Sequence, residues 1–163
     1  MSLTYLSLGS NLGDRLENLK SAVEKLRSRL SFVSCSSVWE TAPIDCPAGS
    51  SAFLNAVCSF ECGIEPVELL SFAKEIEKAL GRKEKLVLNE PRPIDVDILS
   101  FGDVEANSEE LTIPHPRMKE RLFVLAPIRE IQKETFQYQA EYASLLCKQK
   151  VSLFAPPFAI TTV

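Results

Sequence analysis

The segment Pro91-Arg-Pro-Ile-Asp-Val-Asp-Ile-Leu-Ser-Phe-Gly102 alternates between apolar and acidic residues at its centre. Apolar residues occupy every second position from 94 to 98, and Asp95 and Asp97 stand between them. Because side chains alternate along a strand, this pattern predicts a half-buried strand whose acids face away from the core. Carboxylates two residues apart on a strand lie roughly 6.5–7 Å from each other, a spacing that suits shared Mg²⁺ ions with oxygen ligands. A solvated strand face with incidental acids explains the segment equally well, so the rest of the chain has to decide.

The composition is that of an ordinary globular protein. The 163 residues are 45% hydrophobic and 25% charged, which fits one domain with a sizeable core. A net charge of −4 without a basic block argues against nucleic acid as a partner, and no apolar run approaches the roughly 20 residues that span a membrane. Five cysteines without Cys-x-x-Cys spacing predict reduced thiols in a cytoplasmic protein without a signal peptide, and a single histidine argues against zinc.

Hydrophobic periodicity gives the other elements. Residues at three- and four-residue steps predict two amphipathic helices, the first beginning at Asp14 with Glu17 three residues later and the second with Pro66 in its first turn. Runs rich in Val, Phe and Leu predict strands. In chain order, we expect strand 3–8, helix 15–30, strand 31–41, strand 52–62, helix 66–80, a long loop over 82–91 and a strand within 91–102, then a turn at 102–103 and a short return strand.

This order is β-α-β-β-α-β, which predicts an α+β fold of the ferredoxin-like type, an antiparallel sheet with both helices on one face. Further helices are expected over 122–131 and 141–149, whereas the tail 151–163 has no clear assignment. We therefore expect a single domain over 1–163, in which about 132–163 is a weakly patterned C-terminal extension. This fold serves enzymes, ligand sensors and RNA binders alike, so the function has to come from the site.

Two further features leave alternatives open. The segment Gly9-Ser-Asn-Leu-Gly-Asp14 suggests a phosphate loop, but it lacks the lysine of the Walker pattern and is more simply a strand-to-helix turn. Asn55 is a polar amide inside an otherwise apolar strand, and it needs hydrogen-bond partners if it is buried. It could be a structural amide or a reader of a bound ligand.

Several separated segments together resemble one family, the 6-hydroxymethyl-7,8-dihydropterin pyrophosphokinases of folate biosynthesis. The most specific part is the Pro91-Arg-Pro-Ile-Asp-Val-Asp-Ile98 segment together with the later Ile113-Pro-His115. The remaining matching pieces are Gly9–Asp14, Phe53-Leu-Asn55, Glu77, Gly81-Arg82, Lys119, Arg121 and Phe123, so that the resemblance extends from Leu3 to about Ile131.

The resemblance implies an ATP- and Mg²⁺-dependent diphosphokinase, a transferase that moves pyrophosphate from ATP to the hydroxymethyl group of the pterin and releases AMP. It implies that Asp95 and Asp97 hold two Mg²⁺ ions against the phosphates of ATP, and that attack falls on the β-phosphorus. Arginines matching Arg82 and Arg92 would contact the phosphates, which a planar guanidinium suits. The residues expected to bind ATP are Glu77, Ile98, His115 and Arg121.

The second substrate in this family is 6-hydroxymethyl-7,8-dihydropterin, which presents a flat ring and a long hydrogen-bonding edge. The resemblance implies that Phe53 and Phe123 enclose the ring while Asn55 reads its edge. Backbone groups of Thr41, Pro43 and Ile44 are expected to complete the pocket.

The chain departs from the family pattern in one loop. Where the family usually has a basic residue, Trp and Gly, this chain has Leu88, Asn89 and Glu90, which predicts atypical contacts when that loop closes. Three interpretations remain: an active pyrophosphokinase, a binding domain without catalysis, and a degraded kinase domain inside a larger folate enzyme. In some organisms the domain is fused to dihydropteroate synthase, and the apolar tail could begin such a linker.

Overall fold

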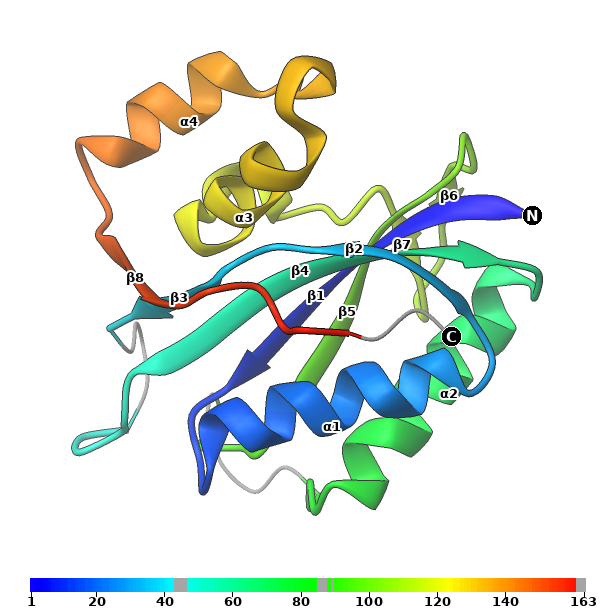
Figure 1. The fold of residues 1–163 in the computed structure, drawn as a ribbon, viewed down its shortest axis with the longest axis horizontal. Helices are drawn as coiled ribbons and strands as arrows, with labels where there is room; N and C mark the ends of the chain where they lie inside the picture. The colour runs from blue at the N-terminus through cyan, green and yellow to red at the C-terminus, as the bar shows by residue number, and fades with distance from the viewer. Residues whose placement is uncertain (43–46, 85–87, 89, 161–163) are drawn as a thin grey trace.

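A six-stranded antiparallel sheet forms the centre of the computed structural model, which describes residues 1–42, 47–84, 88 and 90–160 (Figure 1). Its strands are β1 (Ser2–Ser10), β2 (Ser31–Cys35), β3 (Val38–Thr41), β4 (Phe53–Cys62), β5 (Asp95–Phe101) and β8 (Val151–Ala155). The strand order is β5-β1-β4-β3-β8, and β2 also pairs with β4. The predicted α+β, ferredoxin-like core is therefore confirmed, and β1 and β4 lie at its centre.

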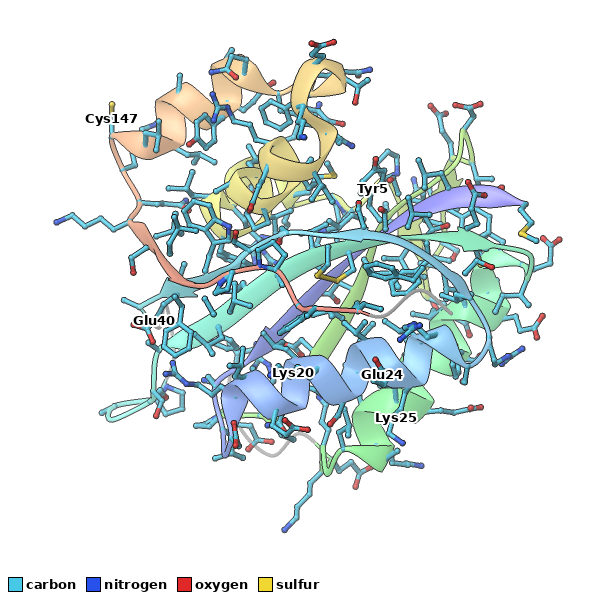
Figure 2. The ribbon with its side chains drawn as sticks, viewed as in Figure 1. Tyr5, Lys20, Glu24, Lys25, Glu40 and Cys147 are labelled. Carbon is cyan, nitrogen blue, oxygen red and sulfur yellow. A yellow bond between two sulfur atoms is a disulfide. The ribbon has the colours of Figure 1, made fainter. Side chains whose placement is uncertain are left out.

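Two helices, α1 (Arg15–Arg27) and α2 (Pro66–Ala79), cover one face of this sheet, as predicted (Figure 1). The Asp14 carboxylate accepts a hydrogen bond from the backbone N–H of Glu17 at 3.1 Å, which caps the start of α1. Lys20, Glu24 and Lys25 lie on the exposed side of α1 (Figure 2). The opposite side of the helix buries its leucines in the larger hydrophobic core, which α1 and α2 share with the sheet.

The other face of the sheet carries the C-terminal helices, α3 (Leu122–Gln132) and α4 (Gln139–Leu146), with the short 3₁₀ turns Met118–Glu120 and Lys133–Thr135 (Figure 1). A smaller core joins α3 to the sheet, and it consists of Val57, Leu99, Met118, Val124 and Ile128. Within the described residues, none of the helices combines the length and the apolar character that crossing a bilayer requires. Only part of the sheet lies under α3, so the remainder of this face is available to a ligand.

One predicted strand proves to be two. The expected strand 31–41 is interrupted between β2 and β3, although both halves pair with β4. Ser36 causes a local break because its hydroxyl accepts a hydrogen bond from the N–H of Val57 at 3.0 Å and donates one to the carbonyl of Ser37 at 2.8 Å. Such side-chain bonds to the backbone compete with a regular ladder.

The structure also changes one assignment after β5 and supplies one that the sequence lacked. The expected return strand is a separate hairpin, in which β6 (Ala106–Asn107) pairs with β7 (Thr112–Ile113) and neither joins the main sheet. The tail had no assignment, yet Val151–Ala155 forms β8 and pairs antiparallel with β3. Tertiary pairing with a distant strand, rather than local pattern, decides the conformation of this segment.

The expectation that the cysteines are reduced is wrong for one pair. Cys35 of β2 and Cys58 of β4 lie opposite each other in the strand register, with Cα atoms 4.1 Å apart, and the structure joins them by a disulfide. Cys62 is a buried free thiol and Cys147 is an exposed one, which lies at the end of α4 (Figure 2). Spacing along the chain gave no indication of the pair because the partners meet only through strand pairing.

Glu130 connects α3 to β3. Its carboxylate accepts hydrogen bonds from the backbone N–H of Ser37 at 3.0 Å, from the Ser37 hydroxyl at 2.5 Å and from the indole N–H of Trp39 at 3.3 Å. Three donors on one ionised acceptor make a strong connection, because hydrogen bonds to charged groups are worth more than neutral ones.

Replacing Glu130 by alanine is expected to lower the free energy of unfolding by about 2–4 kcal/mol, because partly buried donors of Ser37 and Trp39 would lose their acceptor. Urea denaturation of the purified variant measures this change. Glu134→Ala, at an exposed position in the following turn, is the control and should change stability by less than about 0.5 kcal/mol. Equal stability of the two variants would contradict the structural role of Glu130.

Candidate active site

A cleft opens on the sheet face that α3 leaves uncovered. Its floor comes from β1, β4 and β5, and its walls come from the start of β4, the segment that leads into α3, and a turn after α4. The cleft has a cavity volume of about 230 Å³ and continues into an open mouth. The residues that line it are Ser7, Gly9, Thr41, Ala42, Phe53, Asn55, Arg92, Asp95, Asp97, Arg117, Glu120, Arg121, Phe123 and Gln149.

Strand pairing places polar side chains on both sides of Gly9. Gly9 pairs with Asp95 of β5 on one side and with Asn55 of β4 on the other. A Cβ atom at position 9 would lie 3.1 Å from Oδ1 of Asn55 and 3.9 Å from Cβ of Asp95. The absence of a side chain at this position therefore leaves room between an amide and a carboxylate that both point into the cleft.

Asp95 is held by two arginines. The guanidinium of Arg82 contacts Oδ1 of Asp95, and Nε of Arg92 donates to Oδ2 at 2.5 Å. Arg82 also donates to Oε2 of Glu77 at 2.9 Å, and the other oxygen of Glu77 accepts from the N–H of Val96 at 3.0 Å. This chain of contacts ties the end of α2 to β5 and gathers opposite charges beside the cleft.

Asp97 lies on the same face of β5, one alternate position from Asp95, as the sequence predicts. Burial and, to a smaller extent, the charge of Asp95 raise the pKa of Asp97 to about 6, and Arg121 and Arg82 oppose this shift. Burial likewise raises the pKa of Glu77. An ionised Asp97 is therefore not fully compensated by the protein alone.

These carboxylates fit a hard cation. Both belong to one strand face, both line the cleft, and burial together with the charge of Asp95 raises the pKa of Asp97 despite the nearby arginines, so an added cation would stabilise its ionised form. No cluster of three or more His, Cys, Asp or Glu side chains that could hold a metal occurs among the described residues. This donor set matches Mg²⁺, which commonly uses one or two carboxylates and completes its shell with water and substrate phosphates.

An aromatic and amide pocket adjoins the carboxylates. The guanidinium carbon of Arg92 lies 5.2 Å from the centroid of the Phe53 ring, and that of Arg121 lies 5.5 Å from the centroid of Phe123. The amide of Asn55 is buried and donates to the Thr41 hydroxyl at 2.9 Å. Flat rings with nearby arginines and an oriented amide can bind a planar, polar heterocycle.

A family model and the sequences of known relatives agree on one family. The family model of 7,8-dihydro-6-hydroxymethylpterin-pyrophosphokinase (HPPK) matches residues 5–133. The 2-amino-4-hydroxy-6-hydroxymethyldihydropteridine pyrophosphokinase of Bacillus subtilis is 40% identical over 132 residues, which are 80% of this chain and 78% of that relative. This chain belongs to the HPPK family.

Other relatives are longer. The bifunctional protein FolKE of Lactococcus lactis is 37% identical over 154 residues, which cover 93% of this chain but 44% of that protein. A crystal structure of Plasmodium falciparum HPPK-DHPS has a TM-score of 0.70 and 16% identity, and the match covers 90% of this chain and 44% of that one. At this identity the likeness concerns the fold alone. This chain thus spans less than half the length of these two relatives, whose names describe a bifunctional protein and an HPPK-DHPS.

The cleft of this HPPK chain collects most of the predicted site residues. Of the predicted set, Thr41, Phe53, Asn55, Arg92, Asp95, Asp97, Arg121 and Phe123 line the cleft. Pro43 and Ile44 lie outside the described residues, as does Asn89 in the atypical loop, whereas the exposed Leu88 and the neighbouring Glu90 are described. The structure therefore brings the proposed pterin and metal residues together.

Four predicted residues lie beside the cleft rather than in its lining. Arg82 and Glu77 reach it through Asp95 and border a separate hollow with Lys74 and Lys78. Ile98 packs its side chain into the larger core and is 4% exposed, which leaves only its backbone for a ligand.

His115 is the fourth. The backbone N–H of His115 donates to the carbonyl of Leu99 at 2.9 Å, and the imidazole Nδ1 accepts from the backbone N–H of Arg117 at 3.2 Å. Burial, with help from the positive charges of Arg121 and Arg117, lowers the pKa of His115. The imidazole therefore favours its neutral form, in which it can accept as well as donate hydrogen bonds.

Sequence reasoning missed several residues that line the HPPK cleft. Ser7 and Gly9 belong to β1, and the sequence carried a usable signal for Gly9, because a glycine at the end of an apolar strand often marks a close approach. Arg117, Glu120 and Gln149 had no such signal, since they reach the cleft only through the packing of α3 and α4.

Neutralising Asp97 is expected to stabilise the HPPK chain in the absence of metal. A carboxyl group with a raised folded-state pKa opposes folding when ionised, so its cost is present above about pH 6 and disappears below about pH 4. Asp97→Asn should therefore raise the free energy of unfolding by about 1–3 kcal/mol at pH 8 and by nothing measurable at pH 4.

Urea denaturation at the two pH values, without divalent metal, measures this effect. Asp103→Asn, in the exposed turn after β5, is the matched control and should behave like the wild type at both pH values. A variant no more stable than the wild type at pH 8 would mean that Asp97 is compensated within the protein.

Proposed function

We propose that this chain transfers pyrophosphate from ATP to the hydroxyl of 6-hydroxymethyl-7,8-dihydropterin and releases AMP. Family membership supports this reaction, and the pairing of Gly9 with both Asn55 and Asp95 is the structural observation that carries it. One strand separates the amide that would read the pterin from the carboxylate that would hold the metal. The hydroxymethyl group and the phosphates would therefore meet above Gly9.

The reaction has a simple balance. A bond forms between the pterin hydroxyl oxygen and the β-phosphorus of ATP, and the bond from that phosphorus to the α,β-bridging oxygen breaks. AMP leaves with the bridging oxygen, and the hydroxyl proton is released to solvent. Phosphoryl transfer needs mainly positioning and positive charge where negative charge develops, so the protein has to supply orientation and electrostatic stabilisation.

Asp95 and Asp97 would hold two Mg²⁺ ions, which would supply positive charge to the phosphates and to the attacking and leaving oxygens. Arg82 and Arg92, both bound to Asp95 here, lie where they can turn to phosphate oxygens. Their planar forks suit that exchange, because a guanidinium matches carboxylate and phosphate alike. Arg121, which also lines the cleft, would bind the nucleotide together with Glu77, His115 and the backbone of Ile98.

The pterin would lie between Phe53 and Phe123. The hydrogen bond from Asn55 to Thr41 fixes the amide, so its carbonyl oxygen remains available to the amino group of the heterocycle. Backbone groups of Thr41, and of Pro43 and Ile44 outside the described residues, would be the remaining pterin contacts. Stacking on two rings favours a flat bicyclic substrate over a flexible one.

The proposal extends to the cellular setting. We place the chain in the cytoplasm, where ATP is abundant, and beside a second folate enzyme. Relatives supply the support for this partnership, because FolKE of Lactococcus lactis is bifunctional and solved structures join HPPK to DHPS. Dihydropteroate synthase is the partner that the pterin product suggests.

Removing either carboxylate is expected to abolish the reaction while leaving the fold intact. Asp95→Ala and Asp97→Ala should each lower AMP release by at least about a thousandfold, because a lost metal position removes several kcal/mol of charge stabilisation. AMP and the pterin diphosphate are measured with ATP, Mg²⁺ and the pterin, and then without the pterin.

Asp103→Ala is the control and should keep the wild-type rate. AMP formed only in the presence of the pterin supports the reaction. A wild-type rate in Asp95→Ala or Asp97→Ala would refute the metal assignment, and pterin binding without AMP in the wild type would favour a domain without catalysis.

A methyl group at position 9 is expected to weaken pterin binding. The added Cβ of Gly9→Ala would lie 3.1 Å from Oδ1 of Asn55, so the amide, whose nitrogen bonds to Thr41, would have to move by a few tenths of an ångström. We expect pterin affinity to fall by about tenfold, which is the loss of roughly one hydrogen bond.

Fluorescence titration with the pterin measures this change. Gly63→Ala is the matched control, because a Cβ at position 63 meets its nearest atom at an ordinary 3.8 Å. Undiminished affinity in Gly9→Ala would show that Asn55 does not read the pterin.

A further inference from the structure

The amide of Gln149 forms two hydrogen bonds that flank Arg121. Its Oε1 accepts from the backbone N–H of Leu122 at 2.9 Å, and its Nε2 donates to the backbone carbonyl of Glu120 at 2.8 Å. Only this orientation of the amide satisfies both groups, because the reversed one would place donor against donor and acceptor against acceptor. The side chain thus pairs with the backbone on both sides of one residue, as a neighbouring strand would.

This pair of bonds lies at the start of α3. Arg121 is the N-cap residue of α3, its φ and ψ are −120° and 107°, and its own side chain makes no capping bond. The first N–H groups of a helix have no partner within the helix, and a side chain from elsewhere can satisfy one of them. Gln149 supplies that acceptor from a different part of the chain and holds Arg121 in its extended conformation.

Gln149 is itself anchored on both sides. The backbone N–H of Gln149 donates to the carbonyl of Leu145 at 2.8 Å, which ties Gln149 to the end of α4. Two residues later Val151 begins β8 and pairs with Thr41 of β3. The backbone of Gln149 is therefore held in place on both sides. Its half-buried side-chain amide can then fix the position of the segment before α3.

The position of the Arg121 guanidinium depends on the backbone conformation of Arg121. Its side chain lines the cleft with Asp97 and its guanidinium lies over the Phe123 ring, so a rotation of its backbone would move the charge away from both. We propose that Gln149 is a positioning residue that aims Arg121 at the nucleotide, an inference that rests on the proposed function. The C-terminal segment beyond the family match thereby takes part in substrate binding.

The test uses a double-mutant cycle on the full chain. Gln149→Met keeps the length of the side chain and removes both hydrogen bonds, and Gln149→Ala removes the side chain as well. Binding of the Mg²⁺ complex of α,β-methylene-ATP, in which the bond that the reaction breaks is replaced, is measured by calorimetry. We expect a five- to tenfold loss of affinity in Gln149→Met, and less than a twofold further loss when Gln149→Met is added to Arg121→Ala.

Two variants serve as references. Gln149→Glu keeps an acceptor for Leu122 but sets a carboxylate against the carbonyl of Glu120, so it should not restore wild-type affinity. Gln139→Ala, at an exposed glutamine at the start of α4, should bind the analogue like the wild type. Thermal melting of each variant identifies any that has lost its fold, and Gln149→Glu replaces Gln149→Met if that variant unfolds.

The outcomes separate the inference from the proposed function. Unchanged affinity in a folded Gln149→Met variant would overturn the inference. So would a full further loss in the Arg121→Ala background, since Gln149 would then act independently of Arg121. Failure of the proposed function would appear instead in the wild type, as absence of pterin-dependent AMP release.

Discussion

The structure depends on the antiparallel pairing of β1 between β4 and β5. This pairing fixes Gly9 between Asn55 and Asp95, so a shift by one residue would turn the amide and the carboxylates into the hydrophobic core. The apolar residues on the opposite faces of the same strands prevent such a shift, because they are buried under α1 and α2. Packing on one face of the sheet thus determines the chemistry on the other.

The two aspartates of the cleft differ in their electrostatic surroundings. Asp95 is matched by Arg82 and Arg92, whereas burial raises the pKa of Asp97 to about 6. A site with one compensated and one uncompensated carboxylate attracts added positive charge without depending on it for folding.

Local patterns predicted the parts of this protein that local interactions determine. Period-two alternation identified β5 and its outward aspartates, and apolar spacing with the Asp14 cap identified α1. The break at Ser36, the Cys35–Cys58 pair and β8 were missed because each depends on a strand far away in the sequence. The resemblance pointed to eight residues that line the cleft, but Gln149 lies outside the segments that carried it and could be found only from the packing of α4 against the start of α3.

The late position of β8 has a consequence for how the chain folds during synthesis. The family match ends at residue 133, yet Val151–Ala155 pairs with Val38–Thr41. While the chain emerges from the ribosome, the outer edge of β3 stays open until residues 151–155 have been made and have found it, and pairing over so long a separation is slow. An unpaired edge of this kind can pair with wrong partners, so the nascent domain stays open to aggregation along β3 until β8 arrives.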